Sequence, residues 1–155
     1  MDNRIHIKKY DDSNHGALIE FLQNCLPESG RGFDLQGRHN FYCDIDKNFK
    51  SFWVMFDRDE VIGTVAVKEL DAEKCELKSL YLYERYHGNG LGRRLITKAI
   101  EFAAAFGYKY MYLDSLSTST KALTLYKKVG FAETERYNQN EKSDVFMFLT
   151  LNKTE

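Results

Sequence analysis

Three glycines at alternate positions form the part of this sequence with the clearest chemical meaning. Gly88, Gly90 and Gly92 lie between an apolar run and a segment of helical periodicity. Because glycine lacks a Cβ atom, the backbone there can turn sharply and leave N–H groups open beside the positive end of the following helix. Such a helix N-terminus binds anions, phosphates above all. The ordinary alternative is a glycine turn without a ligand, because short glycine patterns recur by chance.

Two arginines after the glycines favour the anion-binding interpretation. Arg93 and Arg94 fall in the first turn of the expected helix, where an exposed cation opposes the helix dipole at a cost of about 0.3–1 kcal/mol. A bound anion nearby would offset that cost. The spacing fits neither a P-loop nor a dinucleotide-binding loop, because no lysine follows the last glycine and the glycines alternate. A nucleotide kinase is therefore disfavoured.

Periodicity predicts the elements that must position this loop. Apolar and aromatic residues over 75–83 predict a strand before it, and apolar residues at three- and four-residue steps over 91–106 predict an amphipathic helix after it. Residues 28–50 show little periodicity and are predicted to form a loop with one short helix, either a binding loop or a solvated connection. The other predicted strands cover 4–10, 51–56, 61–70, 109–114, 131–136 and 144–151, and the other predicted helices cover 16–26 and a segment that ends at Gly130.

The order of these elements predicts one mixed sheet. Short turns join the strands at 51–56, 61–70 and 75–83 into an antiparallel meander, whereas the helix after 75–83 makes the strand at 109–114 parallel to it. A chain of 155 residues is expected to form one domain, residues 1–155, around one core. We therefore predict an α/β (α+β) fold with a mixed central sheet of about six to seven strands and helices on both faces.

Composition disfavours several classes of partner. A formal net charge of −1 gives no broad basic field, so nucleic acid is not an expected partner. The three cysteines, Cys25, Cys43 and Cys75, have no C-x-x-C spacing and are expected to be reduced and buried, and the four histidines lack the spacing of metal ligands. No apolar run approaches the ~20 residues of a membrane span. These features predict a cytoplasmic protein without a metal and without membrane association.

The strand and loop closely resemble motif A of the GNAT superfamily, the acyl-CoA-dependent N-acetyltransferases. In that motif a strand of the form L-x-V precedes Q/R-x-x-G-x-G/A, often written R-G-x-G-x-G. The corresponding residues here are Leu80-Tyr81-Leu82 and His87-Gly88-Asn89-Gly90-Leu91-Gly92. His87 stands where Arg or Gln is usual, so the resemblance implies a phosphate contact from its backbone amide rather than from its side chain.

A second segment resembles motif B of the same superfamily, N-x-x-A-x-x-L-Y-x-x-x-G-F. It runs from Ala122 to Phe131, and Ser119 stands where asparagine is usual. Two motifs in the right order are far more specific than either alone. The resemblance spans roughly Val61 to Phe131, whereas residues 1–50 match it only in the pattern of their elements.

This resemblance implies acetyl-CoA as a co-substrate and no metal. The pyrophosphate is expected on the N–H groups of the loop, and the pantetheine arm between the central strand and Ser119. The N–H of Leu82 is expected to meet the oxyanion that forms on the thioester carbonyl. The residues expected to bind the cofactor are Leu80, Leu82, His87, Gly88, Asn89, Gly90, Leu91, Gly92, Arg93, Ser119 and Tyr126.

Acetyl transfer to an amine poses two proton problems. A primary alkylamine of pKa ~10.4 must lose a proton on or before attack, and the CoA thiolate, similar to a cysteine of pKa ~8.5, leaves more easily when protonated. The resemblance places Tyr126 near the CoA sulfur as the acid; the alternative is a core tyrosine. Glu76 is the candidate base, or else a structural carboxylate paired with Lys78 on the same strand face. Many relatives use a chain of ordered water instead of a side-chain base. Asp114 is a further candidate base, ranked below Glu76.

The acceptor amine is the least determined part of the prediction. In the GNAT superfamily the segment matching 28–50 lies over the acceptor pocket, which makes Phe33, Asp34 and Arg38, together with Tyr137, the candidate substrate contacts. We expect a primary amine of a small molecule, such as an amino acid, or of a peptide. The alternative is a non-catalytic acyl-CoA-binding regulatory module. Dimers are common in the superfamily, so a homodimer is one expected state.

Overall fold

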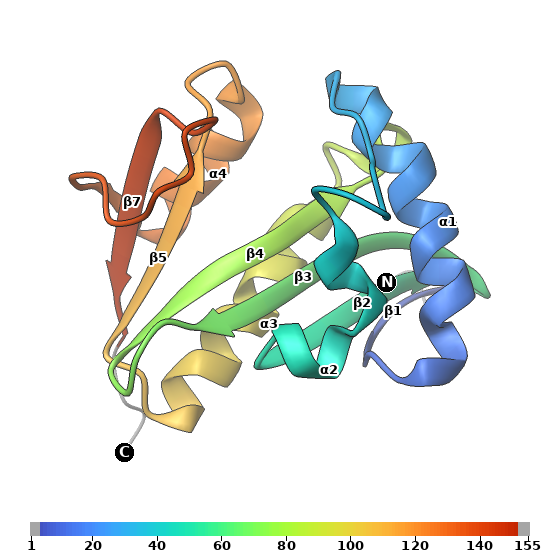
Figure 1. Ribbon diagram of the computed structural model, residues 1–155, viewed down its shortest axis with the longest axis horizontal. Coiled ribbons are helices and arrows are strands. Elements are labelled where there is room, and N and C mark those ends of the chain that lie inside the picture. Colours follow the sequence, from blue (N-terminus) through green and yellow to red (C-terminus); the bar gives the residue numbers. More distant parts are fainter. Residues whose placement is uncertain (1–3, 152–155) are drawn as a thin grey trace.

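The computed structural model describes residues 4–151, which contain one sheet of seven strands (Figure 1). The strand order across the sheet is β1-β2-β3-β4-β5-β7-β6. The predicted mixed sheet with an antiparallel N-terminal meander is confirmed. The predicted single domain, 1–155, includes residues 1–3 and 152–155, which lie outside the described residues, and it stays a prediction. The strands are β1 (Ile5–Lys9), β2 (Ser51–Asp57), β3 (Glu60–Glu69), β4 (Lys74–Leu82), β5 (Tyr110–Ser115), β6 (Ala132–Glu133) and β7 (Val145–Thr150).

Helices cover both faces of the sheet (Figure 1). The helices α1 (His15–Cys25) and α2 (Ile45–Asn48) lie on one face, and α3 (Leu91–Phe106) and α4 (Thr120–Val129) lie on the other. The segment 134–144, between β6 and β7, crosses the same face as α1 and α2. That face is therefore built from α1, one short helix and loops, whereas the opposite layer contains the longest helix, α3, together with α4.

The apolar core lies mainly between the central strands and the helices. β2 and β3 are buried along most of their length, because helices on both faces require both sets of alternating side chains to be apolar. Gly107, with a φ of 111°, ends α3. The apolar stripe of α3 holds its N-terminus beside the end of β4. The buried side chains of α3 are Leu91, Leu95, Ile96, Ala99 and Ala103.

β4 and β5 pair only briefly and then diverge. Their parallel register covers three residue pairs and ends where Glu76 meets Tyr112. β4 nevertheless continues to Leu82 and β5 to Ser115, and Figure 1 shows the two strands separating along these segments. The second half of β4 therefore has a free edge on the β5 side, which we call the β4–β5 gap.

A β-bulge interrupts β4 beside this gap. In the register with β3, Ser79 and Leu80 stand opposite Val65 alone. Ser79 adopts a left-handed φ of 56°, and two hydrogen bonds of 2.7 Å hold it, one from Thr64 Oγ1 to its carbonyl and one between its hydroxyl and Tyr42 Oη. Because the bulge inserts one residue, it reverses the faces that later β4 side chains meet.

Two predicted segments differ from the structure. The segment at 28–50 was predicted to contain one short helix. The structure has three short helices in it or at its edge: α2 and the 3₁₀ helices η2 (Leu26–Ser29) and η3 (Asn40–Cys43). These helices are held by local contacts that periodicity does not reveal, such as the Asp44 carboxylate that accepts the Lys47 N–H at the start of α2 (3.2 Å). The strand predicted at 131–136 ends at Glu133, because β6 forms only two residue pairs with β7.

Several predicted absences were compared with the described residues. Within residues 4–151, no helix combines the length and the apolar character needed to cross a bilayer. In the same residues, no group of three or more His, Cys, Asp or Glu side chains is placed to hold a metal ion. Cys25, Cys43 and Cys75 are free thiols, and Cys43 is exposed, contrary to the prediction.

Candidate active site

The glycine loop leaves a row of backbone donors at the N-terminus of α3. Gly88 and Gly90 have left-handed φ values of 86° and 77°, a region that other residues adopt only with strain. The first helical hydrogen bond runs from Arg94 N–H to the Gly90 carbonyl (3.1 Å). Within residues 4–151, the N–H groups of residues 88–93 have no acceptor. Free N–H groups beside the positive end of a helix dipole suit an anion, and an anion site at these residues stays a prediction.

His87 differs from its predicted role. Its backbone N–H, expected to bind phosphate, donates to the Glu84 carbonyl (3.0 Å) and closes the short 3₁₀ helix η4 (Glu84–Tyr86). Its ring Nε2 lies 3.0 Å from the Leu82 carbonyl. The turn therefore already uses the His87 amide, and the row of free N–H donors begins one residue later, at Gly88.

Leu82 presents its backbone N–H to the β4–β5 gap. The N–H of the next residue, Tyr83, donates to the Ile62 carbonyl on β3 (3.0 Å). Because successive N–H groups of a strand point to opposite sides, the Leu82 N–H points away from β3. The Leu82 side chain instead faces α3, where its Cδ1 and that of Leu95 would each meet a Cβ added at Gly63 at 3.1 Å.

Tyr126 extends from α4 toward the same gap. It is 8% exposed, and its hydroxyl has no hydrogen-bond partner among residues 4–151. Burial raises the pKa of Tyr126 to about 12; the charge of Arg31 lowers it, whereas Tyr81 and Asp114 raise it. These neighbours come from β4, from β5 and from the segment after α1, so the phenol faces charged and polar groups of both strands. At neutral pH it keeps its proton and can donate it to a hydrogen bond.

Glu76 lies at the point where β4 and β5 part, and it is 3% exposed. Its Oε2 accepts hydrogen bonds from Tyr137 Oη (2.5 Å) and from Asn138 Nδ2 (3.1 Å). Burial and the Glu76 charge raise the pKa of Tyr137 far above its usual value, so Tyr137 remains the donor. The ion pair considered from the sequence is present, with Lys78 Nζ 3.7 Å from Glu76 Oε1.

Asp114 belongs to the same network but is held in its charged form. Its carboxylate accepts hydrogen bonds from Ser143 Oγ (2.7 Å), Asn138 Nδ2 (2.7 Å) and Asn140 Nδ2 (3.1 Å). Burial alone would raise the pKa of Asp114, but the hydrogen bond from Ser143, the charge of Lys78 and the two amides together hold that pKa below its usual value. A carboxylate stabilised in this way is a weak base.

The predicted substrate contacts do not form one cluster. Asp34 organises its own loop, because its Oδ1 accepts the Gly37 N–H (3.0 Å). Phe33 stacks on His39 with ring centroids 5.2 Å apart. Arg38 is exposed on the same loop, whereas Tyr137 donates its hydroxyl hydrogen bond to Glu76. The structure therefore places the partly buried Tyr137 beside Glu76, apart from the other three, and a role in substrate contact stays a prediction for all four.

The remaining predicted cofactor residues gather where α3 and α4 begin. Gly92 lies so close to α4 that an added Cβ would stand 3.3 Å from Leu125 Cδ2. Ser119 precedes α4, and its hydroxyl makes no capping hydrogen bond. Arg93 and Asn89 are exposed beside the row of N–H donors. The helix N-termini therefore share one corner of the molecule with polar groups that are free to meet a ligand.

Sequence reasoning missed the residues that complete the Glu76 network. Asn138, Asn140 and Ser143 lie in the segment 134–144, which was predicted only as a link between strands. The available signal was the density of amide and hydroxyl side chains, but such residues usually mark turns. A second missed residue is Ser79, whose bulge gave no local signal beyond one hydroxyl within an apolar strand.

Comparison with known proteins decides the family. Residues 15–131 match the family described as the acetyltransferase (GNAT) family. The chain belongs to this family. The predicted GNAT membership is therefore confirmed.

Two curated relatives are named as N-acetyltransferases. The chain is 28% identical over 130 residues to N-acetyltransferase 8B of Rattus norvegicus, a match that covers 77% of this chain and 59% of the relative. It is 38% identical over 101 residues to the uncharacterized N-acetyltransferase C1271.07c of Schizosaccharomyces pombe, a match that covers 62% of each chain. The GNAT chain thus spans about three fifths of the length of these relatives.

Solved structures share the fold over nearly the whole chain. An acetyltransferase from Streptococcus agalactiae has a TM-score of 0.87 at 20% identity, over 96% of this GNAT chain and 99% of that one. The yncA protein of Salmonella typhimurium, a putative acetyltransferase solved with its cofactor acetyl-CoA, has a TM-score of 0.75 at 20% identity, over 98% and 96% of the two chains. The GNAT fold is therefore shown independently of the sequence motifs.

Proposed function

We propose that this GNAT chain transfers an acetyl group from acetyl-CoA to a primary amine of a small molecule or peptide, by direct attack in a ternary complex. The observation that carries the proposal is the composition of the β4–β5 gap. The Leu82 N–H points into it, the Tyr126 hydroxyl lies in it without a partner among residues 4–151, and the donors of residues 88–93 lie at its end.

The residues present fit a CoA pyrophosphate. Unpaired N–H groups at a helix N-terminus suit an anion, and their number at residues 88–93 suits a diphosphate better than a single carboxylate. Arg93 is exposed beside them and can add a positive charge. The acetyl-CoA in the Salmonella relative supports the same ligand for this fold. The acetyl thioester supplies the activated group, and no metal is part of the proposal.

Tyr126 would act mainly by hydrogen bonding to the departing thiolate. With a pKa of about 12, the phenol is a weaker acid than a thiol of pKa ~8.5 by roughly three to four pKa units. Complete proton transfer from Tyr126 to the sulfur is therefore uphill. The bond stabilises the charge that develops on sulfur, and the proton lost by the amine finally balances it.

For Glu76 the geometry favours a positioning role over that of a direct base. Its Oε2 already accepts two hydrogen bonds, and its Oε1 faces Lys78 at 3.7 Å. An amine proton would then leave through ordered water, with Glu76 holding the segment 134–144 beside the acceptor. A direct base remains the alternative, and the two roles give different pH profiles.

The test of the proposed function is CoA thiol release from acetyl-CoA with a panel of primary amines. The panel includes amino acids, polyamines and peptides with free N-termini, each assayed against a reaction without protein. Amine-dependent release above that background is the expected result. Tight acetyl-CoA binding without release for any amine would contradict it.

A non-catalytic acyl-CoA-binding module is the second candidate. The observation in its favour is His87, whose N–H and ring both bind groups of the protein itself. The Tyr126 hydroxyl supports the enzyme instead, because it has no hydrogen-bond partner among residues 4–151 and is free to donate to a ligand. The predictions of a cytoplasmic location and of a homodimer stay predictions.

A further inference from the structure

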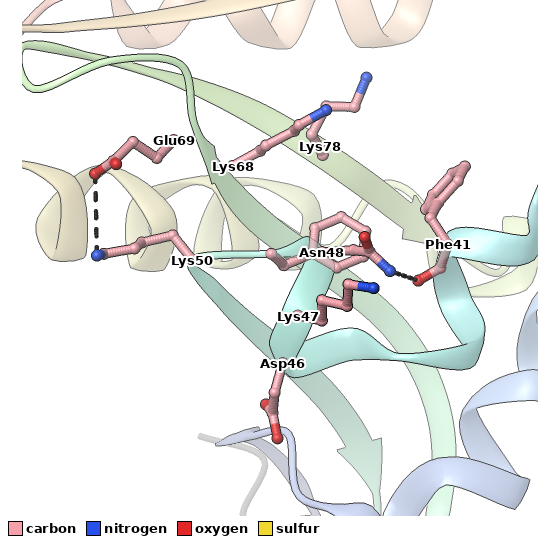
Figure 2. Close-up of a pocket in the computed structure, with 9 residues that line it drawn as sticks. Phe41, Asp46, Lys47, Asn48, Lys50, Lys68, Glu69 and Lys78 are labelled. Carbon is pink, nitrogen blue, oxygen red and sulfur yellow. Dashed lines mark hydrogen bonds and ion pairs between the residues drawn. The ribbon is translucent and has the colours of Figure 1, made fainter.

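A basic cavity lies on the same face as the Glu76 network (Figure 2). Its volume is about 540 Å³, which falls in the range of small-molecule sites. It opens between α2 and the ends of β3 and β4, and the rings of Phe41 and Phe49 form part of its wall. Four lysines line it: Lys47, Lys50, Lys68 and Lys78.

Within the described part of the chain, carboxylates pair with Lys50 and Lys78 but leave the other two lysines of the lining without an ion pair. Glu69 is paired with Lys50, at 3.9 Å between Oε1 and Nζ. Asp46 points away from the other lysines in Figure 2. Among residues 4–151, no carboxylate lies within ion-pair distance of Lys47 or Lys68. Of the four lysines, Lys47 and Lys68 therefore carry the positive charge that is free to meet an anion, in a protein whose formal net charge is −1.

Two of these lysines are fixed beside each other by the sheet. The register pairs Lys68 with Glu76 and Ala66 with Lys78, so Lys68 and Lys78 are diagonal neighbours on one face, at a separation of about 7–8 Å. Figure 2 shows their side chains extending side by side, with Lys47 on the α2 side of the cavity. The Lys68 ammonium has no ion pair among residues 4–151 and can bind an oxygen of a carboxylate or phosphate, whereas the Lys78 ammonium beside it also faces Glu76 and Asp114.

Lys78 connects the cavity to the proposed reaction site. Its Nζ lies 3.7 Å from Glu76 and 4.0 Å from Asp114, while its side chain lines the cavity. Along β4, Lys78 precedes Leu82 by four residues, a span of at most about 13 Å. A small molecule with an amine at one end and an acid at the other, together with the lysine side chain, covers that span.

We propose that this cavity binds the acidic end of the acceptor and thereby directs its amine to the β4–β5 gap. The inference rests on the proposed function and narrows it. The acceptor class is an amine that carries a second, negatively charged group, either a carboxylate or a phosphate. The two phenylalanine rings contact the hydrocarbon part between the two groups. Polyamines and lysine-rich peptides are excluded, because their charge has the same sign as the cavity.

Matched acceptor pairs test the inference directly. γ-Aminobutyrate and its amide have similar size and the same primary amine but differ in the charge of the carboxyl group, and phosphoethanolamine and ethanolamine differ by the phosphate. We expect kcat/KM to be at least about tenfold higher for the charged member of one pair, in the range of charge-assisted hydrogen bonds. The pair that shows the preference identifies the acid as carboxylate or phosphate. Equal kcat/KM values within both pairs would overturn the inference.

Two variants connect the preference to the cavity. Lys68→Gln and Lys47→Gln should each raise KM for the charged acceptor by about five- to tenfold, while KM for its neutral partner and for acetyl-CoA stays within about twofold. Lys98→Gln is the matched control, because Lys98 is exposed on α3, on the opposite face. Equal increases of KM for both members of a pair would contradict a charge-specific role.

If the proposed acetyl transfer does not occur, the assays give a different result. In that case no amine releases CoA thiol, although the protein binds acetyl-CoA. Calorimetric titration of the acetyl-CoA-loaded protein with γ-aminobutyrate and with phosphoethanolamine then tests separately whether the cavity binds an anion. Binding of one of them that weakens about fivefold or more in Lys68→Gln, but not in Lys98→Gln, supports the anion site. Absence of binding to the unaltered protein overturns it.

Discussion

Tyr137 donates a hydrogen bond of 2.5 Å to Oε2 of Glu76, although the two residues lie 61 positions apart in the sequence. The bond joins the segment 134–144 to β4 across the intervening β5. Asn138 strengthens this connection by donating to both Glu76 (3.1 Å) and Asp114 (2.7 Å). Because Glu76 is almost fully buried, its charge requires these donors, and the donors in turn hold the loop over the sheet.

Removal of the Tyr137 hydroxyl should destabilise the fold. Tyr137→Phe takes one donor from a buried carboxylate, and we expect a loss of about 1–3 kcal/mol in the free energy of unfolding. Urea unfolding followed by fluorescence measures it. The matched control is Tyr110→Phe, because the Tyr110 hydroxyl has no hydrogen-bond partner among residues 4–151. Equal stability of the two variants would show that the Tyr137 bond is replaced by water.

Glu76→Gln separates a positioning role from a direct base. The glutamine side chain still accepts a hydrogen bond from Tyr137, but it cannot take up a proton at neutral pH. We expect a higher KM for the acceptor and an unchanged shape of the pH profile of kcat/KM. Loss of the acidic limb of that profile in the variant would instead identify Glu76 as the base.

Tyr126→Phe should slow turnover without weakening acetyl-CoA binding. The hydroxyl lies in the β4–β5 gap without a protein partner among the described residues, so its removal costs little in the free protein but removes a donor to the developing thiolate. We expect kcat to fall by about 10²-fold or more and the acetyl-CoA Kd to stay within about twofold. Tyr110→Phe again serves as the control. A kcat equal to that of the unaltered protein would remove Tyr126 from the mechanism.

Alanine at two different glycines should have opposite effects. Gly90 has a φ of 77°, so Gly90→Ala introduces strain of about 1–2 kcal/mol and should also weaken acetyl-CoA binding. Gly16 lies in α1, where no atom lies within 4 Å of an added Cβ, and Gly16→Ala should stabilise the fold by about 0.4–1 kcal/mol. Denaturant unfolding and titration with CoA measure both effects. Unchanged CoA affinity in Gly90→Ala would argue against the loop as the phosphate site.

The lowered pKa of Asp114 predicts that the folded protein loses stability at acidic pH. Its pKa is lowered in the folded protein from the model-compound value of 3.8, so its contribution to stability is present above about pH 4 and fades as the pH falls through the lower, folded value. Unfolding measured between neutral pH and pH 3 should therefore show a steeper loss of stability below pH 4 for the unaltered protein than for Asp114→Asn. Parallel curves for the two proteins would contradict this assignment.

Most of the fold follows from local patterns. The apolar steps of α3 and the glycines before it specify a strand, a turn and a helix, because each depends on residues close together in the sequence. The two exceptions are β6 and the short helices near residues 28–50, where periodicity gives little signal. β6 is shorter than predicted because only two residues reach β7, and the helices near residues 28–50 depend on caps and turns that carry little periodicity.

The sequence alone determined the glycine loop before α3, the resemblance to the family and the tyrosine of the second motif. The physical reason is that backbone torsion preferences and helical spacing depend on residues that are neighbours in the sequence. Only the tertiary structure decided that the His87 amide is already used, that Tyr137 and Asn138 hold Glu76, and that Lys68 and Lys78 meet beside one cavity. Each of these relationships depends on sheet register or on a loop crossing a strand. Such contacts join residues whose separation in the sequence carries no periodic signal.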